Sequence, residues 1–272
     1  MSDLPVIVTP DGTERKLGFN PDRKAKPISF STRVKQVEVP DFPDSEIVPF
    51  DLAENKSFGY QVKDQFAEGA CTGFGMASVK ELLLWRAGYG NIRLSPWFLY
   101  SIACNGVDRG AYLDQVCDIA TKTGTCEDSL VPARTINPRK LSAAAKADAK
   151  NWRVELTVAL PESWKQIRDC VNARYAIYHS IHADNGLNTL DKEGVPSNRA
   201  GIHNHALAGG FGLKFSKKHG WLMKDPNSWG ASWGHKGYFW CSEGSIQGNY
   251  GQIIAIVSVN VRRELNPPNV VA

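Results

Sequence analysis

One stretch of this chain reads Asn227-Ser228-Trp229-Gly230-Ala231-Ser232-Trp233-Gly234. It places an asparagine amide beside two large aromatic side chains, which can shield a polar contact from water. Upstream of it lie three residues of complementary chemistry, Gln65, Cys71 and His205. With Asn227 they supply an amide donor, a nucleophile, a base and a group that can orient the base. The sequence therefore indicates chemistry that proceeds through a covalent bond to a cysteine.

Length and composition describe an ordinary globular protein. The chain has 272 residues, of which 42% are hydrophobic and 22% charged, and no apolar run approaches the ~20 residues that cross a bilayer. The formal net charge is +4 and the basic residues are scattered, so we expect no nucleic-acid partner. Residues 1–8 carry neither a basic cluster nor a long apolar run. We therefore expect no secretory signal, no membrane insertion, and a location in the cytoplasm or inside a particle such as a virion.

Cysteine and histidine spacing gives no sign of a metal site. None of the cysteines forms a Cys-x-x-Cys pair, and the histidines at 179/182 and 203/205 have no matching cysteine or carboxylate set. We therefore expect no bound metal and no cofactor. We expect most of the cysteines to be reduced, although a disulfide involving Cys104 and Cys126 stays open as an alternative.

The chain divides into four regions by composition. Residues 1–39 are rich in proline and charge and predict an extended arm that lies on the body or on a neighbouring chain. Residues 40–155 predict a mainly helical lobe that carries the nucleophile. Residues 156–262 predict a mainly β lobe that carries the histidine and the asparagine, and residues 263–272 form a C-terminal tail.

Periodicity places elements within the two lobes. A helical pattern starts at Cys71 and stops near Ala87-Gly88, and Ser95-Pro96 is typical of a second helix start. Two further helices are predicted over 111–121 and 140–150. The predicted strands span 175–183, 206–215, 220–224, 237–241 and 253–260. Helices followed by strands indicate an α+β fold with two lobes, and the cleft between them is a natural place for a site.

The four side chains can be assigned roles from chemistry. A cysteine attacks as the thiolate, whereas an unperturbed thiol with a pKa of ~8.5 is mostly protonated at neutral pH. A helix start places positive partial charge beside Cys71, and a protonated His205 adds a full charge. Gln65 could donate its amide N–H, together with the Cys71 backbone N–H, to a developing oxyanion. Asn227 would accept a hydrogen bond from the far ring nitrogen of His205, and Trp229 would cover that bond.

Together these motifs resemble the papain-like cysteine peptidases, in a divergent form similar to bacterial or phage-type members. The resemblance spans about residues 45–262 and keeps the family order of Gln, Cys, His and Asn. It rests on the blocks Asp64-Gln65, Gly69-Ala70-Cys71, Asn204-His205-Ala206 and Asn227-Ser228-Trp229-Gly230. His205 and Asn227 follow Cys71 by about 130 and about 160 residues, close to the ~130–150 typical of the family. The Asn-His-Ala block favours His205 over His203 as the base.

The resemblance implies a helical lobe, an antiparallel β-barrel-like lobe and an active site in the cleft between them. It implies a cysteine endopeptidase in which Cys71 forms a thioacyl-enzyme and His205 is general base and acid. Asn227 would orient His205, and Gln65 would complete the oxyanion hole. Three residues would support this set, namely Gly69, Ala70 and Trp229. Three others would bind a peptide or protein substrate, namely Gly110, Ala111 and Asn204.

Several positions depart from the family pattern. Glu68 and Thr72 stand where members usually carry a disulfide cysteine and a tryptophan, which agrees with a reducing compartment. Residues 1–39 are too short and too broken by proline to form the long helical inhibitory pro-segment of secreted members. Gly110-Ala111 replaces a double glycine and Asn204 replaces an aspartate, so the preference for the second substrate residue is open.

Two alternatives use the same residues differently. The first is a structural or assembly protein, for example virion-associated, that keeps the fold with vestigial or maturation-only activity and buries residues 1–39 between chains. The second is an acyl-transfer enzyme or a hydrolase of cell-wall peptides that uses the same site.

Overall fold

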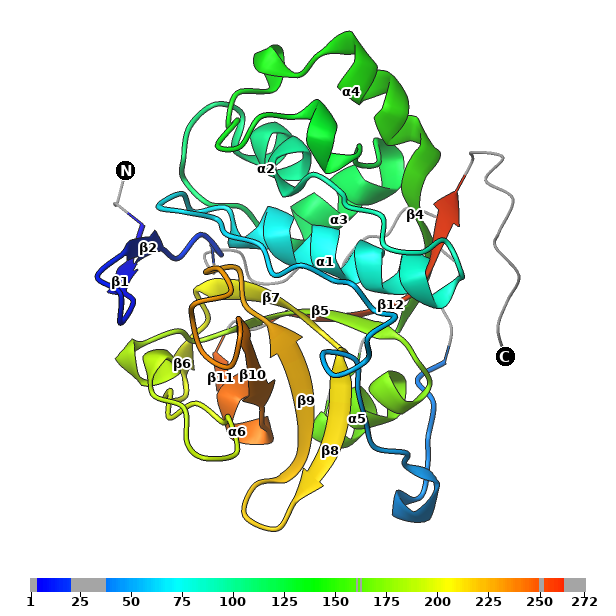
Figure 1. The fold of residues 1–272 in the computed structure, drawn as a ribbon, viewed down its shortest axis with the longest axis vertical. Coiled ribbons are helices and arrows are strands. Elements are labelled where there is room, and N and C mark those ends of the chain that lie inside the picture. Colours follow the sequence, from blue (N-terminus) through cyan, green and yellow to red (C-terminus); the bar gives the residue numbers. More distant parts are fainter. Residues whose placement is uncertain (1–3, 21–37, 160, 162, 250–251, 262–272) are drawn as a thin grey trace.

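The computed structural model describes residues 4–20, 38–159, 161, 163–249 and 252–261. Helices and strands separate in space, with α1 to α4 gathered in one half of the molecule and most strands in the other (Figure 1). The α+β, two-lobed architecture predicted from the sequence is confirmed. No helix in the described part is both long and apolar enough to cross a membrane.

The helical half contains four α-helices and several short 3-10 turns. The α-helices are α1 Cys71–Arg86, α2 Pro96–Cys104, α3 Leu113–Lys122 and α4 Ala143–Asp148. The turns in this half are η2 Asp128–Leu130, η3 Pro138–Lys140 and η4 Ala149–Asn151, and η1 Asp44–Glu46 and η5 Asn185–Asn188 lie outside it. The hydroxyl of Ser95 accepts from the Phe98 backbone N–H at 3.3 Å, which caps α2 as Ser95-Pro96 predicted.

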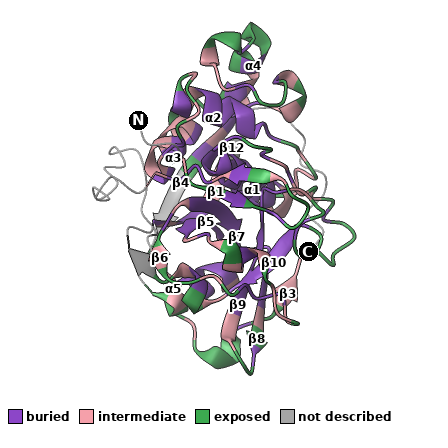
Figure 2. Ribbon diagram, turned by 90° about the vertical axis from the view of Figure 1, so that its left-hand side faces the viewer, coloured by how far each residue is buried: buried purple, intermediate pink, exposed green. Residues whose placement is uncertain are grey.

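Helix α1 is the central element of the fold. Every residue from 71 to 84 is buried, because α2 and α3 pack on one side of the helix and β5, β7 and β12 on the other. Its two buried charged side chains have partners: Lys80 donates to the Trp152 carbonyl at 2.6 Å, and Glu81 pairs with Lys63 at 2.8 Å. Figure 2 shows buried residues along α1, α2 and β5, and exposed ones on α4. The first residue of α1 is therefore held rigidly inside the molecule.

The strand half consists mainly of two antiparallel four-stranded sheets. One has the order β4–β12–β5–β7, with β4 Trp152–Ala159, β12 Ile253–Val261, β5 Ala176–Ile181 and β7 His205–Gly209. The other has the order β10–β9–β8–β3, with β10 Tyr238–Cys241, β9 Gly220–Pro226, β8 Gly212–Ser216 and β3 Phe50–Asp51. The remaining elements are α5 Trp164–Asn172, α6 Glu243–Ile246, and the paired strands β6 Gly201–Ile202 and β11 Gly248–Asn249. An apolar cluster that includes Leu207, Met223 and Phe239 fills the space between the sheets.

Most predicted elements occur, but their bounds differ at several places. The predicted strand over 206–215 is two strands, β7 and β8, because Gly210 adopts a φ of +94° and turns the chain between them. Strand β4 and helix α5 were not predicted. Helix α5 nevertheless has a sequence signal: Ser163 and Gln166 form a capping box, with contacts of 3.3 and 3.2 Å.

The structure describes residues 4–20 and 38–39 of the predicted arm. Strands β1 Val6–Val8 and β2 Glu14–Lys16 form a small antiparallel hairpin, and the chain then continues across the body to residue 20. Leu17 and Phe19 are buried, at 2% and 3% exposure. Residues 21–37 and the tail after residue 261 lie outside the described residues.

Candidate active site

Strands β7 and β9 bring His205 and Asn227 together. His205 is the first residue of β7 and Asn227 directly follows β9, and the His205 Nε2 atom lies 2.9 Å from Asn227 Oδ1. The same Oδ1 accepts from the Ser228 backbone N–H at 2.7 Å, so the amide is oriented with its oxygen toward the ring. The other ring nitrogen, Nδ1, has no hydrogen-bond partner among the described residues. It is therefore available to exchange a proton.

Cys71 lies beside this histidine at the first turn of α1. Its sulfur is close to the backbone N–H of Ala206, the residue after His205, and to that of Gly18. Burial raises the pKa of the Cys71 thiol to about 11, against the opposing effect of these N–H groups. Burial also lowers the pKa of His205 to about 4, although the hydrogen bond to Asn227 opposes it. In this conformation both groups are neutral at pH 7, and the expected thiolate–imidazolium pair is absent.

The Gln65 amide is held by contacts on both sides. Its Nε2 atom donates to the carbonyl of Glu68 at 2.7 Å and to that of Lys16 at 2.9 Å. Its Oε1 atom accepts from the hydroxyl of Ser228 at 2.6 Å. One amide N–H is thus aimed at a backbone carbonyl in the cleft, which is the geometry required of an oxyanion donor.

Ser228 is a site residue that sequence reasoning did not identify. It lies between Asn227 and Trp229, and its backbone carbonyl also accepts from the Gln65 N–H at 2.8 Å. One short segment therefore orients His205 through Asn227 and fixes Gln65 through Ser228. Only its position next to Asn227 in the motif could have indicated this role.

The Trp229 ring lies against the His205 ring. The two rings are 5.0 Å apart between centroids, and Trp229 is 1% exposed. The Trp233 ring packs edge-on against Trp229 at 5.3 Å, so the second tryptophan of the motif braces the first. Gly230 anchors the loop through its N–H to the Lys63 carbonyl at 3.0 Å.

Residues 16–20, here called the strap, occupy the groove expected to bind substrate. The strap pairs with Ala111 on both sides, since the Ala111 N–H donates to the Gly18 carbonyl at 2.8 Å and the Ala111 carbonyl accepts from Asn20 at 3.1 Å. The Phe19 N–H donates to the Asn204 carbonyl at 3.1 Å. Ala111 and Asn204, two of the three positions predicted to bind substrate, therefore bind backbone of the same chain, whereas the Gly110 N–H donates to the Tyr100 hydroxyl at 3.1 Å.

Glycines let the strap approach closely. A Cβ built at Gly18 would overlap the backbone carbonyl of Gly69, and one built at Gly110 would overlap the carbonyl of Gly18. Gly110 also has a φ of +72°, which disfavours other residues. Gly69 and the neighbouring Ala70 thus form the floor beneath the strap, directly before Cys71.

Charged residues anchor the strap at its start. The guanidinium of Arg15, 3% exposed, pairs with Asp64 and donates to the carbonyls of Phe66 and Trp229, both at 3.2 Å. Lys16 pairs with Asp108 at 2.8 Å, and the Asp108 carboxylate also accepts from the Gly69 N–H at 2.9 Å. The hairpin and the loops around Cys71 are therefore joined by ion pairs and hydrogen bonds.

The departures from the family pattern have local explanations. Glu68 pairs with Arg134 at 2.6 Å, where a disulfide would otherwise join the loops. All six cysteines are free, so the Cys104–Cys126 alternative is not realised, and Cys104 instead lies 3.3 Å from the Ile136 carbonyl. Across the described ranges, no three His, Cys, Asp or Glu side chains gather as a metal site.

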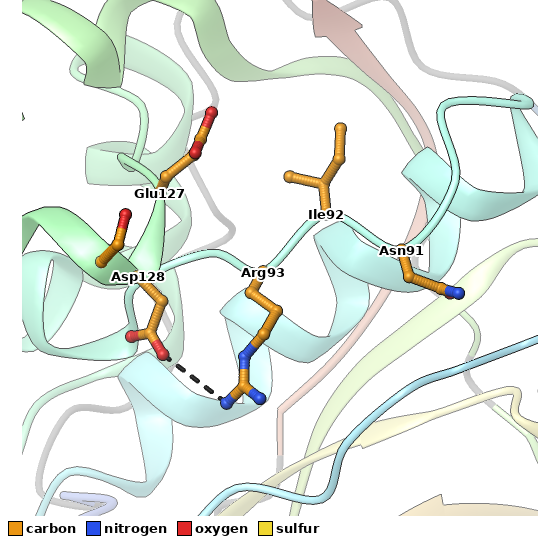
Figure 3. Close-up of a pocket in the computed structure, with 6 residues that line it drawn as sticks. Asn91, Ile92, Arg93, Glu127 and Asp128 are labelled. Carbon is orange, nitrogen blue, oxygen red and sulfur yellow. Dashed lines mark ion pairs between the residues drawn. The ribbon is translucent and has the colours of Figure 1, made fainter.

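Two larger cavities lie outside the cluster of Cys71, His205 and Asn227. One of about 490 Å³ is lined by charged and polar residues, with Arg93 and Asp128 3.6 Å apart (Figure 3). Another of about 490 Å³ lies next to Gln65, with Phe66 and Trp97 in its lining. Neither cavity is lined by Cys71, His205 or Asn227.

Comparison with known proteins links this geometry to one family. Residues 48–258, more than half of the chain, match the family described as papain family cysteine protease. No curated protein matches the chain.

Solved structures with a similar fold include three cysteine proteases or precursors. Xylellain, a cysteine protease from Xylella fastidiosa, has a TM-score of 0.67 and 19% identity over 89% of this chain and 96% of that one. The procathepsin B S9 of Trypanosoma congolense has a TM-score of 0.64 and 17% identity over 84% and 83%. Bromelain from Ananas comosus, in complex with the E64 inhibitor, has a TM-score of 0.61 and 15% identity over 78% and 98%. At sequence identities of 15–19%, the similarity to these three structures is a similarity of fold alone.

Proposed function

This chain belongs to the papain family of cysteine proteases, and from that premise we propose that Cys71 is its nucleophile, His205 its general base and acid, and Asn227 the residue that orients His205. The protein is a cysteine endopeptidase that acts on peptide or protein substrates. The observation that carries the assignment is the 2.9 Å contact between His205 Nε2 and Asn227 Oδ1, which leaves Nδ1 without a hydrogen-bond partner among the described residues, while the Cys71 sulfur lies close to the backbone N–H of the next residue, Ala206.

The proposed reaction proceeds in two halves. His205 Nδ1 takes the proton of the Cys71 thiol, and the thiolate attacks the carbonyl carbon of the scissile peptide. The negative charge that develops on the carbonyl oxygen is stabilised by Gln65 Nε2 and the Cys71 backbone N–H. His205 then protonates the leaving amine, and a water activated by the same ring hydrolyses the thioester.

We further propose that the conformation described here is latent. The strap takes the backbone partners of a substrate at Ala111 and Asn204, and its Lys16 carbonyl takes the Gln65 N–H. Cys71 and His205 are both 0% exposed, and their pKa values of about 11 and about 4 keep them neutral at pH 7. Displacement of the strap would readmit water and substrate and allow the ion pair to form.

The strap differs from a conventional pro-segment in form. The described N-terminal residues form a hairpin and an extended segment rather than helices. The bridge between Phe19 and Ala111 is parallel.

Covalent labelling tests the catalytic assignment. An epoxysuccinyl inhibitor should modify Cys71 after the strap is displaced by mild denaturant or substitution, as read by mass spectrometry of peptides. Cys71→Ala should abolish labelling and peptide hydrolysis, while the matched control Cys104→Ala should retain both. Hydrolysis that survives Cys71→Ala would refute the assignment. Asn227→Ala should lower kcat by about 100-fold, the lower end of what a positioned acid–base group contributes, because the ring remains but loses its orienting partner.

A further inference from the structure

A second pair, made of a histidine and a carboxylate, is buried near the proposed catalytic pair of His205 and Asn227. His179 Nε2 is 2.8 Å from Asp225 Oδ2, and both side chains are 0% exposed. His179 is on β5 and Asp225 on β9, so the pair joins the two sheets of the strand half. The catalytic pair, His205 on β7 with Asn227 after β9, joins the same two sheets (Figure 1).

Strand register shows that the two pairs occupy neighbouring positions along the strands and connect the same two sheets. In the β5–β7 ladder Ile181 lies opposite His205, and His179 lies opposite Leu207. Because side chains alternate between faces, His179 and His205 project from the same face of their sheet. Asp225 and Asn227 are likewise two residues apart along the chain. His179 therefore contacts Asp225, and His205 contacts Asn227.

The side chains that neighbour this second pair, on the same faces of β5 and β9, are otherwise apolar. Ile177 and Ile181 flank His179 on its face of β5, and Met223 precedes Asp225 by two residues on β9. On the neighbouring strand β10, Phe239 lies opposite Asp225 and Cys241 opposite Met223, with the Cys241 thiol beside the Asp225 carboxylate. A buried carboxylate is tolerated here only while it keeps its partner.

Strand β7 leaves room for this carboxylate through a glycine. A Cβ at Gly209 would lie 2.9 Å from Asp225 Oδ1 and 2.5 Å from the Met223 Cε atom. Gly209 shares the face of His205 and Leu207, so β7 is shaped to accept Asp225 four residues from the catalytic ring.

We propose that His179 and Asp225 are positioning residues. Their contact holds β9 in the register that places Asn227 Oδ1 within hydrogen-bond distance of His205 Nε2. A shift of β9 by one residue would turn Asp225 to the opposite face and leave His179 without its acceptor, so the buried pair selects one register. The proposal rests on the assigned roles of His205 and Asn227, because it explains how their contact is maintained.

The test uses NMR of the His205 ring in the full-length protein, a readout that does not require activity. The Nε2 proton bonded to Asn227 should give a slowly exchanging, downfield resonance, assigned by its loss in Asn227→Ala. The double variant His179→Leu/Asp225→Leu removes both polar groups together, so no charge is left unpaired and the protein is expected to fold. Its resonance should be lost or exchange at least tenfold faster, and in enzyme whose strap has been displaced kcat should fall at least tenfold with KM changed less than threefold.

Conservative variants separate positioning from general stability. Asp225→Asn keeps an oxygen that can accept from His179 Nε2, and it should retain the resonance and kcat within about threefold. Glu81→Gln, a matched change at a buried acid remote from this pair, should leave the His205 resonance in place. A double leucine variant that is folded and keeps both the resonance and kcat would overturn the proposal. If Asn227→Ala itself left kcat unchanged, the assigned roles would fail instead, and the two failures are therefore distinguishable.

Discussion

Substitution of Gly18 by alanine should convert the latent enzyme into an active one. Gly18 lies at the middle of the strap, where an added Cβ would overlap the backbone carbonyl of Gly69. A backbone carbonyl in the loop before α1 cannot rotate aside as a flexible side chain could. The strap must therefore lift from the groove.

The magnitude follows from the contacts that are lost. Four hydrogen bonds hold the strap: three backbone bonds of 2.8, 3.1 and 3.1 Å, two with Ala111 and one with Asn204, and one of 2.9 Å from the Gln65 side-chain amide to the Lys16 carbonyl. At about 1 kcal/mol net for each bond, the closed state loses about 3–4 kcal/mol. Since 1.4 kcal/mol is about tenfold, the population with an open groove should rise about 100- to 1,000-fold.

Two assays measure this change. The rate constant for labelling of Cys71 by an epoxysuccinyl inhibitor should rise about 100-fold or more over the wild type, and hydrolysis of a fluorogenic peptide should rise in parallel. Glu14→Ala, an exposed position just before the strap, is the matched control and should change neither rate by more than about twofold. A folded Gly18→Ala protein, verified by circular dichroism, whose labelling rate rises less than threefold would refute the reasoning.

Three further results are expected. Arg15→Ala removes a buried guanidinium that binds Asp64 and two carbonyls, so labelling of the nucleophile should accelerate about tenfold; an unchanged rate would show that the hairpin does not anchor the strap. In the strap-displaced enzyme, Ser228→Ala should lower kcat about tenfold with little effect on KM, because Gln65 loses its 2.6 Å donor; equal kcat values would contradict that role. Burial lowers the pKa of His205 to about 4, so the unfolded state binds its proton first as pH falls below ~6.5, and this group should cost about 2 kcal/mol of unfolding free energy between pH 7 and pH 5. Urea unfolding of the wild type against His205→Gln would measure that difference, and parallel pH dependences would argue against it.

Local signals predicted the elements that present the site. Ser95-Pro96 marked the start of α2, and the apolar pattern after Cys71 marked α1, because capping and helical periodicity are properties of neighbouring residues. The division of 206–215 into β7 and β8 was not predicted, since it depends on the left-handed conformation that Gly210 adopts in the folded chain. The capping box at Ser163 was present in the sequence and overlooked.

The contacts that control the site could not be predicted in this way. The strap is bound by backbone groups of Ala111 and Asn204, and backbone groups carry no sequence signature. The role of Ser228 depends on a contact with Gln65, a residue 163 positions away. Burial also opposes the expected ionisation of the cysteine and histidine, because desolvation outweighs the nearby N–H groups at Cys71 and the hydrogen bond from Asn227 at His205.

The sequence by itself determined the chemistry available to this protein. Gln65, Cys71, His205 and Asn227, in that order and spacing, specify side chains with the required donors, acceptors and nucleophile, and those properties belong to the residues themselves. Tertiary structure decided whether that chemistry is expressed. It brought a distant backbone segment over Cys71 and set β9 against β7 through His179 and Asp225, and both depend on how close two parts of the chain approach in space.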